Sequence, residues 1–464
     1  MRRTGLLLVS GVIASLLACD GDTLPLQGDS QASNVGGEAT GGTKCLDGTF
    51  NDAPQARWCT DCLRCGSLEQ LAACTKTRDT ECAHLGVGRG TGQPDALDEQ
   101  YVEVARDLAV DQSGNVWLVG DASDALTGLS VGAFLRKYPT DGSSASFELF
   151  GSDGQDIAIA IAPSGTIWVA GTTTDDLGGP AQGETDVYVR RYEPGSAQPI
   201  TDHFGTSSAE HVADIITDAA GNAWVVGDTA GDLVGARNAS SALFLRVYSP
   251  AGDATTGQFG GPGDQRAFGV AVDGAGNVWI AEEISQFDGS VDAAVLKLPA
   301  DGTTATTDRL GSAAIANPSM GIAVDSAGNA WVAAAVEESA LIRKYPADGS
   351  APVTELIANA APRGVAVDND GNAWVVGEAY CNVADDYLYD PLRDLNICSA
   401  QGPGLGQSDS FIRQYPADGA TPSNYQFGTR SVDRLSAVTP GIDYGVWVLG
   451  IRSQWQESIW HVSP

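Results

Sequence analysis

The chain has 464 residues, 57 of them glycine, with only 18% charged residues and a formal net charge of −33 at pH 7. Abundant glycine with few charged residues is typical of a turn-rich β protein and argues against a helical bundle or a coiled coil. The acidic surplus repels phosphate backbones, so the chain is not expected to bind nucleic acid.

Residues 1–19 are predicted to be an export signal that ends in a lipid-attachment cysteine. Two arginines precede an apolar run from Gly5 to Ala18, which is too short for a transmembrane helix. The run ends in "LLAC", which resembles the lipobox of bacterial lipoproteins, and this resemblance implies that Cys19 becomes the acylated first residue. An ordinary secretory signal is the alternative. Residues 20–44 are polar and rich in Gly, Ser and Thr, as expected for a flexible tether.

Eight cysteines remain after Cys19, an even number that predicts disulfide bonds in an oxidising compartment. Six lie in residues 45–82, which resemble the cysteine-rich module of tumour-necrosis-factor receptors through "CLDGTF", the C-x₂-C-x₂-C cluster and "CTKTRDTEC". The resemblance implies the pairs Cys45–Cys59, Cys62–Cys74 and Cys65–Cys82, whereas the residues alone leave fifteen connectivities open. A zinc site on Cys59, Cys62 and Cys65 is the alternative, but an exported chain favours disulfides. The last two, Cys381 and Cys398, are expected to form a disulfide in an insertion at 381–407.

The phrase "DAAGNAWVVGDT" at Asp218–Thr229 recurs along the chain from about Gln100 onward. One unit contains four segments rich in aromatic and β-branched residues, at 211–218, 223–229, 243–249 and 254–260, with Gly, Asn, Asp and Pro between them. Gly221-Asn222 in the first turn suits the left-handed backbone angles of a tight hairpin. The tryptophan of the phrase marks seven units: Trp117, Trp168, Trp224, Trp279, Trp331, Trp374 and Trp447. Seven such units predict an all-β fold, a seven-bladed β-propeller of four-stranded blades.

The repeats also resemble the bacterial seven-bladed propeller repeat called SBBP. The matching segments are "GVAVDGAGNVWIAE" (Gly269–Glu282), "DVYVRRYEPG" (Asp186–Gly195) and "FGTSSAEHVADI" (Phe204–Ile215). The resemblance covers roughly Gln100 to the C-terminus and implies a propeller there; with the closing strand described below, the propeller is expected to span residues 83–464. The second unit lacks the Asp ("PSGTIW"), and the seventh has an altered turn ("PGIDYGVW"). Because the seventh unit ends after three strands, residues near Ala83–Gly88 are expected to supply its fourth strand and close the ring.

Two charged positions recur in the aligned units. The third strand carries a basic residue in six units and a histidine in the last: Arg136, Arg190, Arg246, Lys297, Arg343, Arg413 and His461. We interpret these as structural partners of acids or carbonyls within or between blades, in preference to an anion-binding ring. Acidic residues follow the second strand in four units: Asp121, Asp228, Glu283 and Glu378. They are candidates for a ring that binds a ligand or a cation at one face, with solvated strand ends as the alternative.

No motif for a catalytic nucleophile, a zinc protease or a phosphate loop occurs, so no catalytic residue, metal or cofactor is predicted. The turn "DNDGN" (368–372) leaves calcium open as a structural ion, although it coincides with the repeat turn. The sequence therefore predicts a monomeric, lipid-anchored protein of the bacterial cell envelope that binds a protein or a glycan. We expect it at the outer membrane or cell surface rather than the inner membrane. A lyase or hydrolase in the central channel is the alternative, which a pocket with converging histidine and carboxylates would favour.

Overall fold

The computed structural model describes residues 101–462 apart from 154, 236–238, 314–318, 380–408, 428–433, 443–444 and 453–455, together with five short strands between Thr49 and Gly86. The chain divides into two compact units, Met1–Leu85 and Gly86–Pro464. The export signal, the tether, the insertion and the cysteine side chains lie outside the described residues. Among the residues described, no helix has the length and apolar character needed to cross a membrane.

The first unit contains two small antiparallel sheets. β1 (Thr49–Phe50) pairs with β2 (Thr60–Asp61), and β3 (Gln70–Ala72) pairs with β4 (Glu81–Cys82). The disulfide pairing expected for this stretch stays a prediction.

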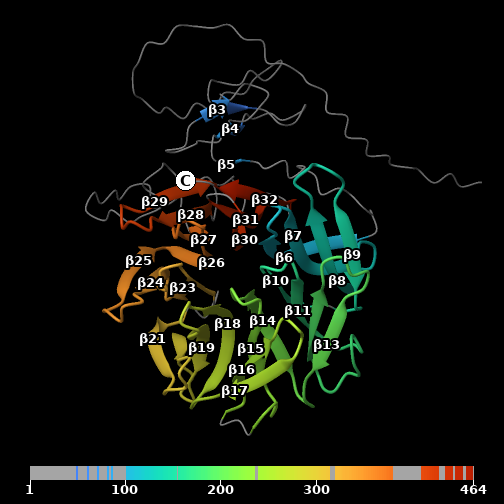
Figure 1. Cartoon of the computed structure of the whole chain (residues 1–464). Coiled ribbons are helices and arrows are strands. Elements are labelled where there is room, and N and C mark those ends of the chain that lie inside the picture. The colour runs from blue at the N-terminus through green and yellow to red at the C-terminus, as the bar shows by residue number, and fades with distance from the viewer. Residues whose placement is uncertain are drawn as a thin grey trace, which may run out of the picture. The chain divides into compact units, whose positions relative to one another are not determined.

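The second unit is a β-propeller of seven four-stranded antiparallel sheets, which confirms the predicted fold. Figure 1 shows the sheets set around a common axis, in colour order from β6 to β32. The innermost strand of each blade contacts that of the next blade, and β30 contacts β6, so the ring is closed. The seventh sheet has the order β30-β31-β32-β5, and β5 (Leu85–Gly86) falls within the range expected to supply that strand.

The strands of each blade follow in chain order from the centre outward. The first three blades consist of β6 (Tyr101–Val110), β7 (Val116–Asp124), β8 (Ser130–Tyr138), β9 (Ser146–Phe150); β10 (Gln155–Ile161), β11 (Ile167–Thr173), β12 (Asp186–Tyr192), β13 (Ile200–Phe204); and β14 (Glu210–Thr217), β15 (Ala223–Thr229), β16 (Ala242–Tyr248), β17 (Ala254–Phe259). The next two consist of β18 (Asp264–Val272), β19 (Val278–Ser285), β20 (Val291–Leu298), β21 (Thr306–Ser312); and β22 (Met320–Val324), β23 (Ala330–Val336), β24 (Ser339–Tyr345), β25 (Val353–Ala358). The last two contain β26 (Ala360–Val367), β27 (Ala373–Ala379), β28 (Asp409–Tyr415), β29 (Ser423–Phe427); and β30 (Arg434–Pro440), β31 (Val446–Arg452), β32 (Gln456–Val462).

The repeated phrase forms the first hairpin of a blade, and its Asp, Asn and Trp bind one another. In the third blade, Asp218 Oδ1 accepts hydrogen bonds from the backbone amides of Ala220 and Asn222, at 2.9 Å each. Its Oδ2 accepts from the Asn222 side chain at 2.8 Å and from Trp224 Nε1 at 2.9 Å. Gly221 has a φ of 84°, which suits glycine, but Asn222 does not share the left-handed conformation expected of both. The asparagine is instead there to hold the carboxylate.

The same bonds recur around Asp111, Asp273, Asp325 and Asp368. The second blade has Ala162 where these blades have the aspartate, and Nε1 of its buried Trp168 has no hydrogen-bond partner among the described residues. Replacement of the aspartate by Ala162 therefore removes the acceptor for the tryptophan Nε1 hydrogen bond in the second blade.

Replacing Trp374 by phenylalanine is expected to cost about 1–2 kcal/mol more unfolding free energy than replacing Trp168, because only Trp374 loses a hydrogen bond to a carboxylate. The two indoles are 0% and 2% exposed, so both substitutions lose similar apolar contact. Trp374 Nε1 donates to Asp368 Oδ2 at 2.8 Å. Urea denaturation of the two variants measures the difference, and equal costs would contradict a stabilising role for this bond.

Glycines of the second strands leave room for aromatic rings on the third strands. Gly227 pairs with Phe244, and a Cβ on Gly227 would lie 2.0 Å from the His211 carbonyl oxygen and 2.6 Å from the ring. The same pairing occurs at Gly120–Phe134, Gly171–Tyr188 and Gly377–Phe411. The fourth blade reverses it: the small residue is Ala294 on the third strand, and its partner is the completely buried Glu282.

Four of the basic residues of the third strands tie neighbouring blades together, whereas Arg136 pairs with Glu103 of its own blade and Lys297 lies over the Trp279 ring. Arg246 Nη2 donates to Asp202 Oδ2 on the outer strand of the preceding blade at 2.7 Å, and the Tyr248 hydroxyl donates to the same oxygen at 2.8 Å. Equivalent ion pairs are Arg190–Glu148, Arg343–Asp308 and Arg413–Glu355.

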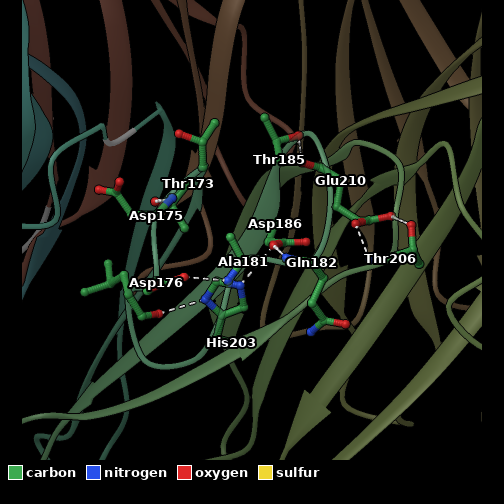
Figure 2. A network of polar contacts seen from close by, with 12 residues as sticks. Thr173, Asp175, Asp176, Ala181, Gln182, Thr185, Asp186, His203, Thr206 and Glu210 are labelled. Carbon is green, nitrogen blue, oxygen red and sulfur yellow. Dashed lines mark hydrogen bonds and ion pairs between the residues drawn. The ribbon is translucent and has the colours of Figure 1, made fainter.

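A buried polar network lies where the second blade meets the third, as Figure 2 shows. His203 Nε2 lies 3.1 Å from Asp186 Oδ2, its Nδ1 lies 2.9 Å from the Leu177 carbonyl oxygen, and the His203 and Asp186 side chains are each 1% exposed. The buried Glu210 accepts hydrogen bonds from the Thr206 amide at 2.7 Å and from the Thr206 hydroxyl at 2.8 Å. These bonds fix the loops at the same end of the blades as the pocket described next.

Candidate functional site

A pocket of about 900 Å³ opens at the face where the second strands end. Its walls come from the first four blades, and it combines charges of both signs with serine and glutamine side chains. The first strands contribute Val104, Arg106, Gln155, Asp156, Ile157, His211, Val212, Ala213, Asp264, Gln265, Arg266, Ala267 and Phe268. The second strands and the segments that follow them contribute Asp121, Ala122, Ser123, Gly128, Ser130, Asp228, Ser241 and Ser285.

The register of the first hairpins brings these charged residues together. His211 is the direct cross-strand partner of Asp228, and Arg266 is the partner of Glu283. Side chains of directly paired residues lie on the same face of the sheet, with Cβ atoms about 4.5–5.5 Å apart. A β-bulge in the first strand of the fourth blade adds Phe268, which follows Arg266 by two residues and also lines the pocket.

His211 is held by a carboxylate of the neighbouring blade. Its Nδ1 lies 3.2 Å from Asp156 Oδ2, and both side chains are 47% exposed, so about half of the imidazole is open to the pocket. Asp156 has a φ of 48°, a left-handed angle that aspartate tolerates better than most residues. The hydrogen bond to Asp156 raises the pKa of His211, and partial burial opposes it.

Asp228 faces His211 across the hairpin in a more buried position. Burial raises the pKa of Asp228 to about 6, while the charges of His211 and Arg266 oppose that rise. Asp228 raises the pKa of His211, and His211 lowers the pKa of Asp228. The Asp228 carboxyl and the His211 imidazole therefore titrate as a pair.

Arg266 supplies an uncommitted cation. Its guanidinium carbon lies 5.1 Å from the centroid of the Phe268 ring. Within the described part of the chain it makes no hydrogen bond or ion pair, in contrast to the third-strand arginines. Cation–π contact holds the guanidinium without using its hydrogen-bond donors.

The predicted acidic ring is placed partly at this pocket. Asp121 and Asp228 line it, while Glu283 and Glu378 are not among its lining residues. Asp121 accepts hydrogen bonds from Arg106 Nε at 3.1 Å and from Arg106 Nη2 at 2.5 Å. Glu378 Oε1 lies 2.9 Å from Arg363 and 3.5 Å from Arg434. Asp121 and Glu378 are thus each paired with arginine side chains. That Asp121, Asp228, Glu283 and Glu378 share one ligand stays a prediction.

Two further carboxyls of the first strands link blades. Asp107 accepts the amides of Leu108 and of Ile159 in the next blade, at 2.8 and 2.9 Å, and Asp214 accepts those of Ile215 and Val270, at 2.8 and 3.0 Å. Burial raises the pKa of Asp107 to about 6 and that of Asp214 to about 7. Neither lines the pocket.

The described residues contain no group of three or more His, Cys, Asp or Glu side chains that could hold a metal ion. The "DNDGN" turn is a repeat hairpin, in which Asp368 accepts hydrogen bonds from Asn372 and Trp374. A structural calcium ion elsewhere in the chain stays untested.

Sequence reasoning missed His211, Asp156, Arg106 and Arg266 as pocket residues. The hairpin register was only a partial signal. Counting back across the turn from Asp228 and Glu283 reaches Val212 and Ala267, and a β-bulge in each first strand shifts the actual partner by one residue, to His211 and Arg266. Asp156 could not be found in this way, because a bulge in β10 and a positive φ set its position.

No family model matches the chain, and no curated protein matches it. Among solved structures, YCF48 bound to D1 peptide is 11% identical with a TM-score of 0.45, over 79% of this chain and 97% of that one. An α-L-arabinanase from Penicillium chrysogenum complexed with arabinobiose is 10% identical with a TM-score of 0.41, over 60% and 90%. A protein of unknown function from Dyadobacter fermentans is 12% identical with a TM-score of 0.40, over 78% and 94%. The functional argument therefore rests on the pocket of this chain.

Proposed function

We propose that this chain is a lipid-anchored binding protein of the bacterial cell envelope, and that it holds a glycan in the pocket of its propeller. The pocket carries the proposal. Its volume of about 900 Å³ lies within the range of ligand sites, and its wall offers carboxylates, guanidinium groups, serines and glutamines beside the ring of Phe268.

The balance of charges in the pocket favours a polyhydroxylated ligand over a simple cation. Asp121 is paired with Arg106, Asp156 is paired with His211, and Arg266 lies near Asp228. Such a wall presents hydrogen-bond donors and acceptors side by side, which sugar hydroxyls can satisfy in both directions.

Sequence features support the envelope location. The "LLAC" end of the apolar run, the polar tether and the even number of cysteines after Cys19 all fit an exported lipoprotein. The SBBP-like repeats and the receptor-like cysteine-rich stretch fit a protein that presents a folded surface outside the cytoplasm. Acylation of Cys19 would be seen as a mass increase on the first residue of the mature protein, and an unmodified Cys19 would remove the anchor.

Filling the pocket is expected to abolish glycan binding. Ser130 lines the pocket and is exposed, so Ser130→Trp adds an indole there without disturbing the core. Ser144→Trp is the matched control, because Ser144 is exposed in the turn at the opposite end of the same blade. Calorimetric titration with a panel of soluble oligosaccharides should show at least about 10-fold weaker binding for Ser130→Trp only, equivalent to about 1.4 kcal/mol. Equal affinity of both variants would move the glycan site away from this pocket.

A further inference from the structure

We propose that the pocket is also catalytic, and that it cleaves uronate-containing glycans by β-elimination. Arg266 binds the carboxylate of the sugar, His211 removes the proton next to it, and Asp228 protonates the leaving oxygen. This inference rests on the proposed glycan binding and names both the class of glycan and the reaction.

Arg266 identifies the ligand as acidic. The chain carries 26 basic against 59 acidic residues, so a guanidinium at a pocket wall that makes no ion pair or hydrogen bond with the described residues stands out. Phe268 supports it from one side, which leaves its planar donors free for a carboxylate. A sugar carboxylate would make the bidentate contact that Arg266 lacks among the described residues.

The same guanidinium lowers the barrier to proton removal. The C–H group beside an ionised carboxylate is a weak acid, because removal of its proton places a second negative charge on the carboxylate. A cation bound to that carboxylate stabilises the charge as it develops. Arg266, His211 and Asp228 all line the pocket, so one ligand can contact the three groups, and the charge of Arg266 opposes the rise in pKa of the other two.

His211 is placed to act as the base. Asp156 accepts at Nδ1, which assigns the hydrogen to that nitrogen in the neutral ring and leaves the Nε2 lone pair for the substrate. In this arrangement Asp156 is a positioning residue, and the half-exposed imidazole is within reach of a ligand in the pocket.

The elimination balances without any further reactant. His211 Nε2 takes the proton from C5, the electron pair forms the C4=C5 double bond, and the C4–O4 bond breaks. Asp228 gives its proton to O4, which leaves as a hydroxyl. The products are an unsaturated uronate and a shortened glycan, and a proton returns from His211 to Asp228 through solvent.

Glycoside hydrolysis fits these residues less well. It uses two carboxyl groups on opposite sides of the scissile bond. Here Asp156 is engaged with His211, and Asp228 is the cross-strand partner of the same histidine. Both carboxyl groups therefore lie beside the His211 imidazole rather than on opposite sides of a glycosidic bond.

The groups facing His211 predict a bell-shaped pH profile. They are Asp156 on β10, Asp228 on β15 and Arg266 on β18, with Glu283 opposite Arg266. The reaction requires a neutral imidazole and a protonated Asp228, so the His211–Asp228 pair must hold a single proton. Activity is lost at low pH when both are protonated and at high pH when neither is.

The test uses the full-length chain with polygalacturonate and alginate, and dextran as the uncharged control. The C4=C5 bond conjugated with the carboxylate is followed by its ultraviolet absorbance, and binding is measured separately by calorimetry. His211→Ala should reduce the rate at least about 100-fold with affinity changed less than about 3-fold. Arg266→Gln should weaken uronate binding about 10-fold or more. Arg434→Gln is the matched control, because Arg434 occupies the corresponding register position in the seventh blade and does not line the pocket.

Each outcome decides between the two proposals. Absorbing product from the uronates that disappears in His211→Ala supports the elimination. Uronate binding by the wild type without product at any pH from about 5 to 9, the range of the groups concerned, overturns the catalysis and leaves the binding function standing. Product that persists in His211→Ala overturns the assignment of the base. Absence of both binding and product with every glycan overturns both proposals.

Discussion

Replacing His203 by alanine is expected to lower the free energy of unfolding by about 3–5 kcal/mol, the cost of breaking a buried ion pair on one side. His203 Nδ1 lies 2.9 Å from a carbonyl oxygen, which can only accept, so this nitrogen carries a hydrogen. Nε2 lies 3.1 Å from Asp186 Oδ2, so a second hydrogen is shared between ring and carboxylate. Alanine removes this partner and leaves Asp186, whose side chain is 1% exposed, as a buried carboxylate that keeps the hydrogen bond from the Gln182 amide, at 2.6 Å, but has lost its histidine.

The third blade supplies the control. Register places Ala242 and Gln258 where the second blade has Asp186 and His203. Gln258 Nε2 donates to the Gly231 carbonyl oxygen at 3.1 Å, in the way that His203 contacts the Leu177 carbonyl. The double variant Asp186→Ala, His203→Gln should therefore recover most of the loss seen in His203→Ala. Chemical denaturation followed by tryptophan fluorescence measures both, and a loss below about 1 kcal/mol in the single variant would contradict the ion-pair account.

Substituting Glu282 by glutamine is expected to stabilise the protein at pH 8 by up to about 3 kcal/mol, because about 1.4 kcal/mol accompanies each pKa unit. Glu282 is 0% exposed, and one of its oxygens has no hydrogen-bond partner among the described residues. Burial raises the pKa of Glu282 from 4.5 to about 7, against the charge of Arg309 and a hydrogen bond from Gln265.

The sign of the pH effect follows from proton counting. Between the unfolded pKa of 4.5 and the folded pKa of about 7, the folded protein binds more protons at Glu282 than the unfolded chain does. Stability therefore falls as the pH rises through this window, and the loss is complete above the folded pKa. Glu282→Gln should flatten that part of the stability curve, while Glu338→Gln controls for the loss of an exposed carboxylate. If the curves of unfolding free energy against pH for the wild type and Glu282→Gln run parallel from pH 4.5 to 8, the destabilising effect of a buried Glu282 charge is contradicted.

The fold could be read from the sequence because five of the seven blades repeat the same local chemistry. Trp224 recurs with its Asp and Asn at fixed spacing, and the structure shows that the three side chains bind one another. The missing Asp in the second unit is also visible in the sequence, and it explains why Trp168 Nε1 has no hydrogen-bond partner among the described residues. The role predicted for Asn222 was wrong. A Gly-Asn dipeptide is typical of left-handed turns, but in this turn only Gly221 has a left-handed backbone conformation.

The pocket could be predicted only in part, since it is assembled from four blades. Asp121 and Asp228 were found by aligning units, a comparison that detects what the blades share. His211 occurs at its position in one blade, and the position of Arg266 is matched by an arginine only in the seventh blade, Arg434, so an alignment in search of residues shared by most units passes over both. The position of Asp156 in the pocket depends on a local irregularity of the backbone, which the pattern of side chains in the sequence does not predict.

Hydrogen exchange on the full-length chain, with and without the tightest-binding oligosaccharide of the panel, tests the central claim most directly. If the pocket is the ligand site, bound glycan should slow exchange in β14, β15 and β18, which carry His211, Asp228 and Arg266. Protection confined to the fifth to seventh blades, or to the turns at the opposite end of the blades, would contradict it.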